Sequence, residues 1–264
     1  MSTERIEVTR REFIIRGAAA GAGFALGLNL PLLGRTAIAA ENGATGADTP
    51  EINAWVVIRP DDTVVIRIAR SEMGQGTLTG LAQLVAEELE CDWSKVITEY
   101  PTPGENLRRD RVWGSFATGG SRGIRESHLY VRKGGAVARH MLVQAAAEAW
   151  DVPMEACSAE NSVITHLPTG RTTTFGKVAK AAAELWPPEQ VALKDPADWK
   201  LIGQPVKRLD TADKLNGKQV FGADLRLPGM LNAAIKACPV FTGKLASFDA
   251  EKVQAMPGVR AVLA

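Results

Sequence analysis

The residues of this sequence that could bind a ligand lie in two glycine-rich stretches. The first reads Glu-Met-Gly-Gln-Gly and includes Gly74, Gln75 and Gly76. The second reads Thr-Gly-Gly-Ser and consists of Thr118, Gly119, Gly120 and Ser121. Each precedes a segment with helical apolar spacing, so backbone N–H groups and the positive end of a helix dipole would face outward there. This arrangement suits an anionic ligand such as a phosphate or an oxo-anion.

Two side chains in these stretches add hydrogen-bonding capacity. The Gln75 amide can donate and accept at once, which suits a polar ring edge or an oxo ligand. The Ser121 hydroxyl can cap its helix or bind an anion. Two carboxylates, Glu72 and Glu126, lie near the stretches. We expect them to be solvated or capping groups, and we assign no catalytic residue.

The spacing of the first stretch fits the common nucleotide-binding motifs poorly. A P-loop places Gly-Lys-Ser/Thr at the start of its helix, whereas this sequence has Gly-Thr-Leu at 76–78. A dinucleotide fingerprint needs G-x-G-x-x-G directly after a strand, whereas here three residues separate the second and third glycines. A nucleotide-binding enzyme stays an alternative, and it is the one that fits the spacing worst.

Composition argues against several other classes of protein. The 264 residues carry a formal net charge of +1. Basic residues form no stripe interleaved with aromatics, so we expect no nucleic-acid partner. The three cysteines and three histidines show neither Cys-x-x-Cys nor His-Glu-x-x-His spacing. We therefore expect no metal bound directly by protein ligands, and any metal would arrive inside a cofactor.

Apolar periodicity and turn signals predict an α+β domain over 52–185. Its expected elements are, in order, a hairpin turning at 60–62, a helix at 77–89, a strand at 94–100, a helix at about 124–150, a hairpin turning at 168–170 and a helix at 175–185. The two longest helices each follow one of the glycine stretches. Gly134 and Gly135 lie inside the helix at 124–150, where they mark close packing or a kink.

The rest of the chain is expected to form a linker at 186–207 and a second domain at 208–264. The linker is rich in proline and has no clean period. The second domain has short apolar runs that predict strands, with a Pro-Gly turn at 228–229. A helix and another Pro-Gly turn then lead to a last expected strand, which reaches Ala264.

Residues 1–39 have the pattern of a twin-arginine export signal. Arg10 and Arg11 precede a weakly hydrophobic run at 17–33, and Ala-Ile-Ala at 37–39 supplies a cleavage site. Because the run is short for a membrane span and is interrupted by Pro31, we favour export over a transmembrane anchor. This route carries folded proteins, often with a cofactor inserted in the cytoplasm. Residues 40–51 would form a disordered spacer.

The stretch EMGQGTLTGLAQLVAEEL, followed by FATGGSRG, resembles the molybdopterin-binding region of the xanthine oxidase/aldehyde oxidase family. More narrowly, the layout resembles the large (beta) chain of isoquinoline 1-oxidoreductase and related exported aldehyde dehydrogenases. In that branch a twin-arginine signal precedes the cofactor-binding segment, which precedes an α/β hammerhead domain. Residues 208–264 resemble that hammerhead. The resemblance covers nearly all of the chain after the signal.

The resemblance implies cofactor contacts for both glycine stretches. In the family the Met-Gly-Gln-Gly segment lies against a molybdenum-molybdopterin cofactor, which gives that role to Gly74, Gln75 and Gly76. The Thr-Gly-Gly-Ser loop contacts the same cofactor, so residues 118–121 would do so here. One departure is Arg122, which stands where small residues are usual; it would contact a phosphate or face solvent. The cytosine dinucleotide form of the cofactor is expected.

The resemblance also implies an activity and partners. Such enzymes oxidise aldehydes or N-heterocycles and pass electrons to a [2Fe-2S] small subunit and often to a cytochrome c. The implied location is the periplasm, with attachment to the inner membrane through partners left open. The family's catalytic glutamate lies in a Gly-Glu-Pro-like motif that this sequence lacks.

From this departure we expect the hammerhead-like domain to be truncated and the chain to be inactive alone. It would then be a fragment, or one half of a split subunit whose other half is a second polypeptide. The rival interpretation is a non-catalytic chain that keeps the family fold without cofactor turnover.

Overall fold

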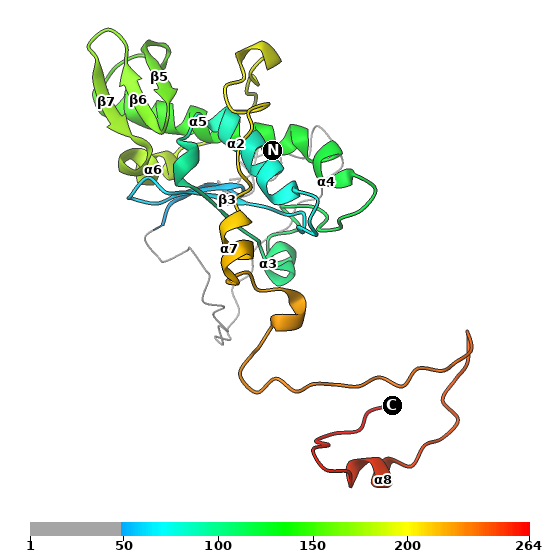
Figure 1. Cartoon of the computed structure of the whole chain (residues 1–264). Helices are drawn as coiled ribbons and strands as arrows, with labels where there is room; N and C mark the ends of the chain where they lie inside the picture. Colours follow the sequence, from blue (N-terminus) through cyan, green and yellow to red (C-terminus); the bar gives the residue numbers. More distant parts are fainter. Residues whose placement is uncertain (1–48) are drawn as a thin grey trace, which may run out of the picture. The chain divides into compact units, whose positions relative to one another are not determined.

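A computed structural model describes residues 49–264 (Figure 1). The expected signal at 1–39 and most of the expected spacer at 40–51 therefore lie outside the described residues. The described chain forms two units: the first ends at Gly217, and the second comprises Lys218–Ala264. None of the helices between residues 49 and 264 is both long enough and apolar enough to cross a membrane.

A four-stranded sheet forms the base of the first unit. Its strands are, in spatial order, β1 (Glu51–Asn53), β2 (Val56–Ile58), β3 (Val64–Arg67) and β4 (Val96–Glu99). The first three strands pair antiparallel, and β4 pairs parallel to β3. Every residue of β2 and β3 is buried. The predicted hairpin is confirmed, and its turn is held by the Thr63 N–H, which donates to the Asp61 carboxylate at 3.0 Å.

Strand β1 lies where the spacer was expected to end. Glu51, its first residue, forms ion pairs with Arg67 and Arg109, the latter over 2.6 Å. The Arg109 guanidinium lies 4.7 Å from the centre of the Trp113 ring, and Trp113 is buried. The ordered domain therefore begins by residue 51, because these contacts hold the first strand to the sheet.

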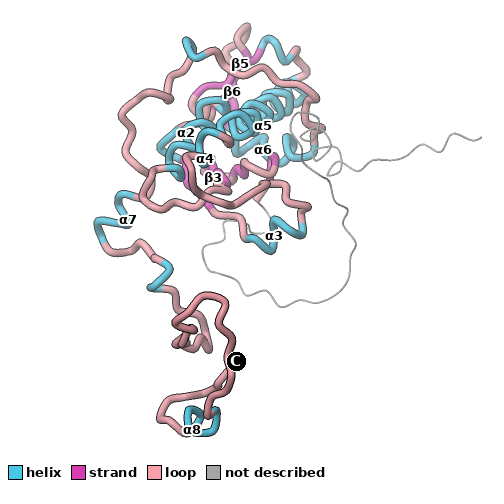
Figure 2. Tube along the Cα trace, turned by 90° about the vertical axis from the view of Figure 1, so that its right-hand side faces the viewer, coloured by secondary structure: helices cyan, strands magenta, loops and turns pink. Residues whose placement is uncertain are grey.

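Two long helices pack side by side in the first unit (Figure 2). They are α2 (Thr77–Leu89), which connects β3 to β4, and α5 (His128–Trp150). A Cβ added to Gly135 would lie 2.4 Å from the Val85 carbonyl oxygen, and one added to Gly134 would lie 2.9 Å from the Trp55 ring. The close packing expected for this glycine pair is confirmed.

The helix predicted at about 124–150 is broken near its start. A short helix, α4 (Arg122–Arg125), is separate from α5, and Ser127 lies between them. The buried Ser127 hydroxyl accepts hydrogen bonds from Arg70 Nε at 3.1 Å and from the Tyr130 hydroxyl at 2.7 Å. The prediction of one continuous helix was wrong, because these side-chain contacts hold the serine where the helix would otherwise pass.

A second, three-stranded antiparallel sheet lies beyond the end of α5. It consists of β5 (Cys157–Glu160), β6 (Val163–His166) and β7 (Arg171–Thr174), and α6 (Phe175–Glu184) follows it. The predicted hairpin is β6–β7, and β5 adds an edge strand to it. The shorter helices of the first unit are η1 (Trp93–Lys95), α3 (Pro103–Arg108), η2 (Met154–Ala156), η3 (Pro196–Asp198) and α7 (Thr211–Asn216). The predicted α+β character of this region is confirmed.

The segment expected to be a linker, 186–207, belongs to the first unit. The Glu87 carboxylate of α2 accepts the backbone N–H groups of Lys200, Leu201 and Ile202 at 2.6–3.2 Å. The Lys194 ammonium donates to the same carboxylate at 2.6 Å. The segment lacks a helical or strand period because a single buried carboxylate on α2, and not a regular element, holds its backbone in place.

The second unit holds one 3-10 turn, η4 (Gly222–Asp224), one helical turn, α8 (Ala250–Gln254), and no strand between residues 218 and 264. The strands expected for a hammerhead are therefore not formed in this structure. Large apolar side chains stay exposed, among them Phe241 at 100% and Ile235 at 91%. A strand needs a paired neighbour and an apolar surface against one face, and residues 218–264 supply neither to themselves.

Candidate functional site

The two glycine stretches meet in the first unit. The Thr118 hydroxyl and the Gln75 amide both donate to the Ser71 carbonyl oxygen, at 3.1 Å and 3.0 Å. Ser71 lies just before the first stretch, and Thr118 opens the second. The structure therefore brings together two motifs that are far apart in the sequence, and it does so through one shared hydrogen-bond acceptor.

This meeting point lies beyond the carboxyl ends of the parallel strands β3 and β4. The Ile68 N–H donates to the Glu99 carbonyl at 2.9 Å and extends their pairing. The next residue after β4 is Tyr100, whose hydroxyl accepts a hydrogen bond from the Glu72 N–H at 3.3 Å. Ligands of open α/β sheets bind beyond the carboxyl ends of the strands, so the location suits a binding site.

Arg70 holds the second stretch in place, and the sequence interpretation missed it. Its side chain is buried just after β3, where Nη1 donates to the Ala117 carbonyl at 2.7 Å. Its Nε donates to Ser127 ahead of α5, and Nη2 lies 3.8 Å from the Glu126 carboxylate. The signal in the sequence was an arginine directly after a buried strand, where an unpaired charge would be costly.

Two glycines allow α4 to lie against the start of α2. A Cβ added to Gly123 would lie 3.0 Å from Thr77 Cγ2, and one added to Gly80 would lie 3.2 Å from Ile124 Cδ1. Gly80, the third glycine near the first stretch, therefore serves helix packing. The loops that lead into α2 and α4 are held next to each other by this contact.

Glu72 occupies the N-terminal end of α2. Its Oε1 accepts the N–H groups of Gly74 at 2.7 Å and Gly76 at 2.9 Å, and its Oε2 accepts that of Leu78 at 3.1 Å. Burial alone would raise the pKa of Glu72, but these donors together with Arg208 lower it below its ordinary value. The capping role expected for Glu72 is confirmed.

The same contacts correct the expectation for the first stretch. Its N–H groups were expected to face an anionic ligand, but those of Gly74, Gly76 and Leu78 already donate to Glu72. The sequence interpretation treated Glu72 as a neighbour of the loop. A Glu four residues before a glycine at a helix start can instead supply the anion from within the chain.

Gln75 keeps half of its hydrogen-bonding capacity free of these loop contacts. Its Oε1 accepts from the Met73 N–H at 2.6 Å, and its Nε2 donates to the Ser71 carbonyl at 3.0 Å. A glutamine amide has two acceptor and two donor positions, so one of each is left by this pair of bonds. The side chain is exposed, and the backbone partners fix which end of the amide faces which way.

Four glycines of the two stretches present open backbone. A Cβ added at Gly74, Gly76, Gly119 or Gly120 would meet no atom within 4 Å. Three of them have positive φ, which is +103° at Gly74, +88° at Gly76 and +55° at Gly120. A group lying against both stretches could therefore approach the backbone closely. The described residues fit a flat polar cofactor at this surface better than an anion at the end of α2.

The end of the second stretch is less well organised for binding. Ser121 has a positive φ of 56° and makes no side-chain cap to α4. The exposed Arg122 turns back, with Nε 3.4 Å from the Gly119 carbonyl oxygen. Of the two roles expected for the Ser121 hydroxyl, capping is therefore not observed. Arg122 faces solvent next to the loop.

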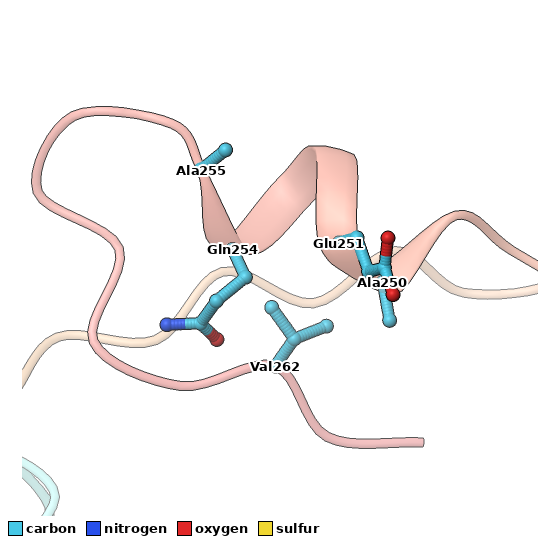
Figure 3. A pocket seen from close by; sticks show the side chains of 5 residues that line it. All are labelled: Ala250, Glu251, Gln254, Ala255 and Val262. Atoms are coloured by element: carbon cyan, nitrogen blue, oxygen red, sulfur yellow. The ribbon is translucent and has the colours of Figure 1, made fainter.

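A shallow hollow in the second unit is a poorer candidate. It lies between α8 and the last residues, where the Gln254 side chain points toward Val262 (Figure 3). The other lining residues are Ala250, Glu251 and Ala255. A ligand site needs several convergent polar groups in an enclosed space, and this lining offers one amide and one carboxylate on an open surface.

A family model described as the molybdopterin cofactor-binding domain matches residues 10–225 of the chain. The match includes both glycine stretches and the whole first unit as far as it is described. It therefore covers most of the chain and the region where the geometry places the candidate site.

Curated relatives align over most of this chain and over a smaller part of their own length. The beta chain of isoquinoline 1-oxidoreductase of Brevundimonas diminuta is 28% identical over 98% of this chain and 37% of its own length. Membrane-bound aldehyde dehydrogenase [pyrroloquinoline-quinone] of Gluconacetobacter polyoxogenes is 29% identical over 97% of this chain and 33% of its own length. A nicotinate dehydrogenase subunit of Pseudomonas putida is 28% identical over 81% and 18%. The chain thus spans about a third of the first two relatives.

Proposed function

The chain belongs to the molybdopterin cofactor-binding domain family, and we propose that it forms the cofactor-binding part of a molybdenum hydroxylase that oxidises aldehydes or N-heterocycles. The substrate classes follow from the relatives, whose names refer to isoquinoline, an aldehyde and nicotinate. Because the chain spans only part of each relative, the activity is proposed for a complete enzyme that includes this chain.

One observation carries this proposal. The Gln75 amide and the Thr118 hydroxyl converge on the Ser71 carbonyl, and the glycines on either side leave open backbone around that point. Gly74, Gln75, Gly76 and residues 118–121 would hold the cofactor there. The molybdenum of the cofactor would supply the redox chemistry, while this chain binds and orients the cofactor and keeps its polar edge against Gln75.

The finer features of the enzyme are proposals that rest on the family resemblance. We propose the cytosine dinucleotide form of molybdopterin as the cofactor. Electrons would leave through a [2Fe-2S] small subunit and then a cytochrome c. The glutamate that acts as base in the family would come from outside this chain, either from a second polypeptide or from a longer form of this one.

The substitution Gln75→Ala tests the proposed site. It removes the bonds to Ser71 and Met73 and also the amide that would face the cofactor. Since a hydrogen bond to a buried polar partner contributes about 1.5–3 kcal/mol, cofactor occupancy of the complete enzyme should fall by roughly ten- to a hundredfold. Molybdenum and molybdopterin per chain are measured on the protein purified with the subunits that accompany it.

Gln144→Ala serves as the matched control, because Gln144 makes its side-chain bond to Glu148 on α5. It should leave cofactor content unchanged, and thermal unfolding should show both variants folded. Equal molybdopterin in Gln75→Ala and wild type would remove the site from these loops. Mass spectrometry of the extracted cofactor adds a second decision, because pyrroloquinoline quinone without molybdopterin would contradict the proposal itself.

The second candidate is a non-catalytic chain that keeps the family fold. It is favoured by the exposed apolar side chains of residues 218–264, which indicate that this unit is not folded against its own surface. The same cofactor analysis separates the two candidates. A folded wild-type chain that copurifies with its subunits and contains no molybdopterin would support the non-catalytic one.

We propose that the protein is exported to the periplasm by its twin-arginine signal. Arg10 and Arg11 precede a weakly apolar run, and a cofactor inserted in the cytoplasm requires a route for folded proteins. Replacing both arginines by lysine should therefore leave the protein in the cytoplasm. Fractionation followed by immunoblotting measures this, and undiminished periplasmic protein in the double variant would refute the proposal.

A further inference from the structure

On the basis of the proposed function, we propose that Glu72 is a positioning residue for the cofactor, and that Arg208 holds Glu72 in place. Glu72 would act through the loop and not by touching the cofactor. The proposal deepens the assignment of the first glycine stretch by naming what keeps Gln75 and the open glycines in their arrangement.

The first support is the number of donors that converge on one carboxylate. Three backbone N–H groups within a run of five residues, from Gly74, Gly76 and Leu78, all donate to Glu72. The Glu72 side chain is 10% exposed. Each of these bonds bends the chain back on itself, so together they hold residues 72–78 as a closed loop on the end of α2.

The second support is the clamp from the far side of the loop. Arg208 Nη2 lies 3.1 Å from Glu72 Oε1, and Arg208 Nη1 donates to the Gly74 carbonyl at 2.9 Å. Asp210 accepts from Arg208 Nε and Nη2 at 3.1 and 3.0 Å. The guanidinium therefore bonds both the carboxylate and the backbone of the loop, and its own orientation is set by a second carboxylate.

The segment that carries Arg208 is itself fixed to α2. The Leu209 N–H donates to the Thr79 hydroxyl at 3.0 Å, one turn into the helix that the loop begins. Arg208 thus approaches the loop from a segment anchored on the same helix. The loop is held from its own carboxylate on one side and from residues 208–210 on the other.

These contacts decide how the loop can take part in binding. An external anion would have to displace Glu72 to reach the N–H groups of Gly74 and Gly76. The loop instead offers the open faces of its glycines and the remaining donor and acceptor of Gln75. Glu72 determines where those groups lie, because without it Gly74 and Gly76 lose the bonds that oppose their wide backbone freedom.

Glu72→Gln is the decisive variant. A glutamine keeps the size of the side chain, but its NH₂ group would face an N–H donor of the loop and the charge toward Arg208 is lost. Hydrogen exchange of the amides at 74, 76 and 78 should quicken by about ten- to a hundredfold, as expected for losing bonds to a charged acceptor. Cofactor content of the purified enzyme should fall at least about tenfold, and Arg208→Gln should lower both in the same direction.

Two controls separate positioning from loss of stability. Glu126→Gln removes a carboxylate near the second stretch that accepts no loop N–H in the described contacts. Ile164→Val removes a methylene from the fully buried Ile164 of β6, far in the chain from the loops. It lowers global stability by about a factor of ten in the unfolding equilibrium. Both should keep wild-type cofactor content and wild-type exchange at 74, 76 and 78.

The outcomes distinguish the inference from the proposed function. Wild-type cofactor content in Glu72→Gln, or cofactor loss in Ile164→Val as large as in Glu72→Gln, would overturn the positioning role. Unchanged exchange at the three amides would overturn the loop geometry on which it rests. Wild-type enzyme without molybdopterin would overturn the proposed function, and the inference about the cofactor with it.

Discussion

Glu87→Ala is expected to destabilise the first unit by about 3 kcal/mol. The Glu87 carboxylate is 1% exposed and accepts the Lys194 ammonium and the backbone N–H groups of Lys200, Leu201 and Ile202. Removing one partner of a buried ion pair costs about 3–5 kcal/mol, because the other charge stays buried. Lys194 keeps Glu90 as a partner at 2.6 Å, which places the expected cost at the lower end.

The effect should depend on pH in a defined direction. Burial would raise the pKa of Glu87, but Lys194 and the three N–H donors outweigh it and lower the pKa below its ordinary value of 4.5. A carboxyl with a lowered pKa in the folded state stabilises the fold above the unfolded value and loses that contribution as pH falls. The difference between wild type and Glu87→Ala should therefore be full near pH 7 and shrink below about pH 4.5.

Urea unfolding of the full chain at several pH values measures both effects. Limited proteolysis adds a local measurement, because cleavage within 186–207 should become faster when the segment is released from α2. Glu184→Ala, at an exposed position of α6, is the matched control and should change stability by less than about 0.5 kcal/mol. Equal stability of Glu87→Ala and wild type at pH 7 would show that the segment is not held by this carboxylate.

The elements that the sequence predicted well are those whose pattern is local. The hairpin β2–β3 has β-branched runs on both sides of Pro-Asp-Asp, and α2 follows its apolar spacing from Thr77 to Leu89. In both cases the residues that form the element also determine its ends. The break between α4 and α5 is different, because Arg70 and Tyr130 hold Ser127 from other parts of the chain. No period within 122–150 reports such a contact.

The same distinction applies to the candidate site. Glycine density located both stretches correctly, because an open backbone needs residues without Cβ. It did not reveal that Glu72 takes the N–H groups of the first stretch, since that depends on how the chain folds back on α2. Arg70 and Arg208 were also missed, because each acts on a residue far away in the sequence.

The second unit shows where a correct local pattern is insufficient. Its apolar runs predicted strands, but a strand forms only when a neighbour satisfies its backbone and an apolar surface covers one face. Phe241 and Ile235 remain exposed, so the pattern is present and the covering surface is not within 218–264.

Gly135→Ala is expected to destabilise the first unit by about 2 kcal/mol. The added Cβ would lie 2.4 Å from the Val85 carbonyl oxygen and 3.1 Å from the Glu88 Cβ. A backbone oxygen cannot rotate away, so α2 and α5 must move apart, and overpacking of this kind costs about 1–3 kcal/mol or more. Alanine recovers up to roughly 1 kcal/mol of helix propensity over glycine, which leaves a net loss.

The same displacement should reach the candidate site. The first glycine stretch leads directly into α2, and the second leads through α4 into α5, so separating the helices moves the two stretches relative to each other. Their shared contact at the Ser71 carbonyl depends on bonds of 3.0 and 3.1 Å, which a shift of an ångström would break. Cofactor content should therefore fall together with stability.

Two glycine variants serve as controls in urea unfolding. Gly104→Ala in α3 would place its Cβ 3.8 Å from the far end of the Arg108 side chain, so it should be neutral or stabilising by up to about 1 kcal/mol. Gly134→Ala would meet the Trp55 ring at 2.9 Å, and because that ring is a side chain that can shift, its cost should be smaller than that of Gly135→Ala. If Gly135→Ala were as stable as Gly104→Ala, α2 and α5 would not be in backbone contact, and the two stretches would lose the support that places them together.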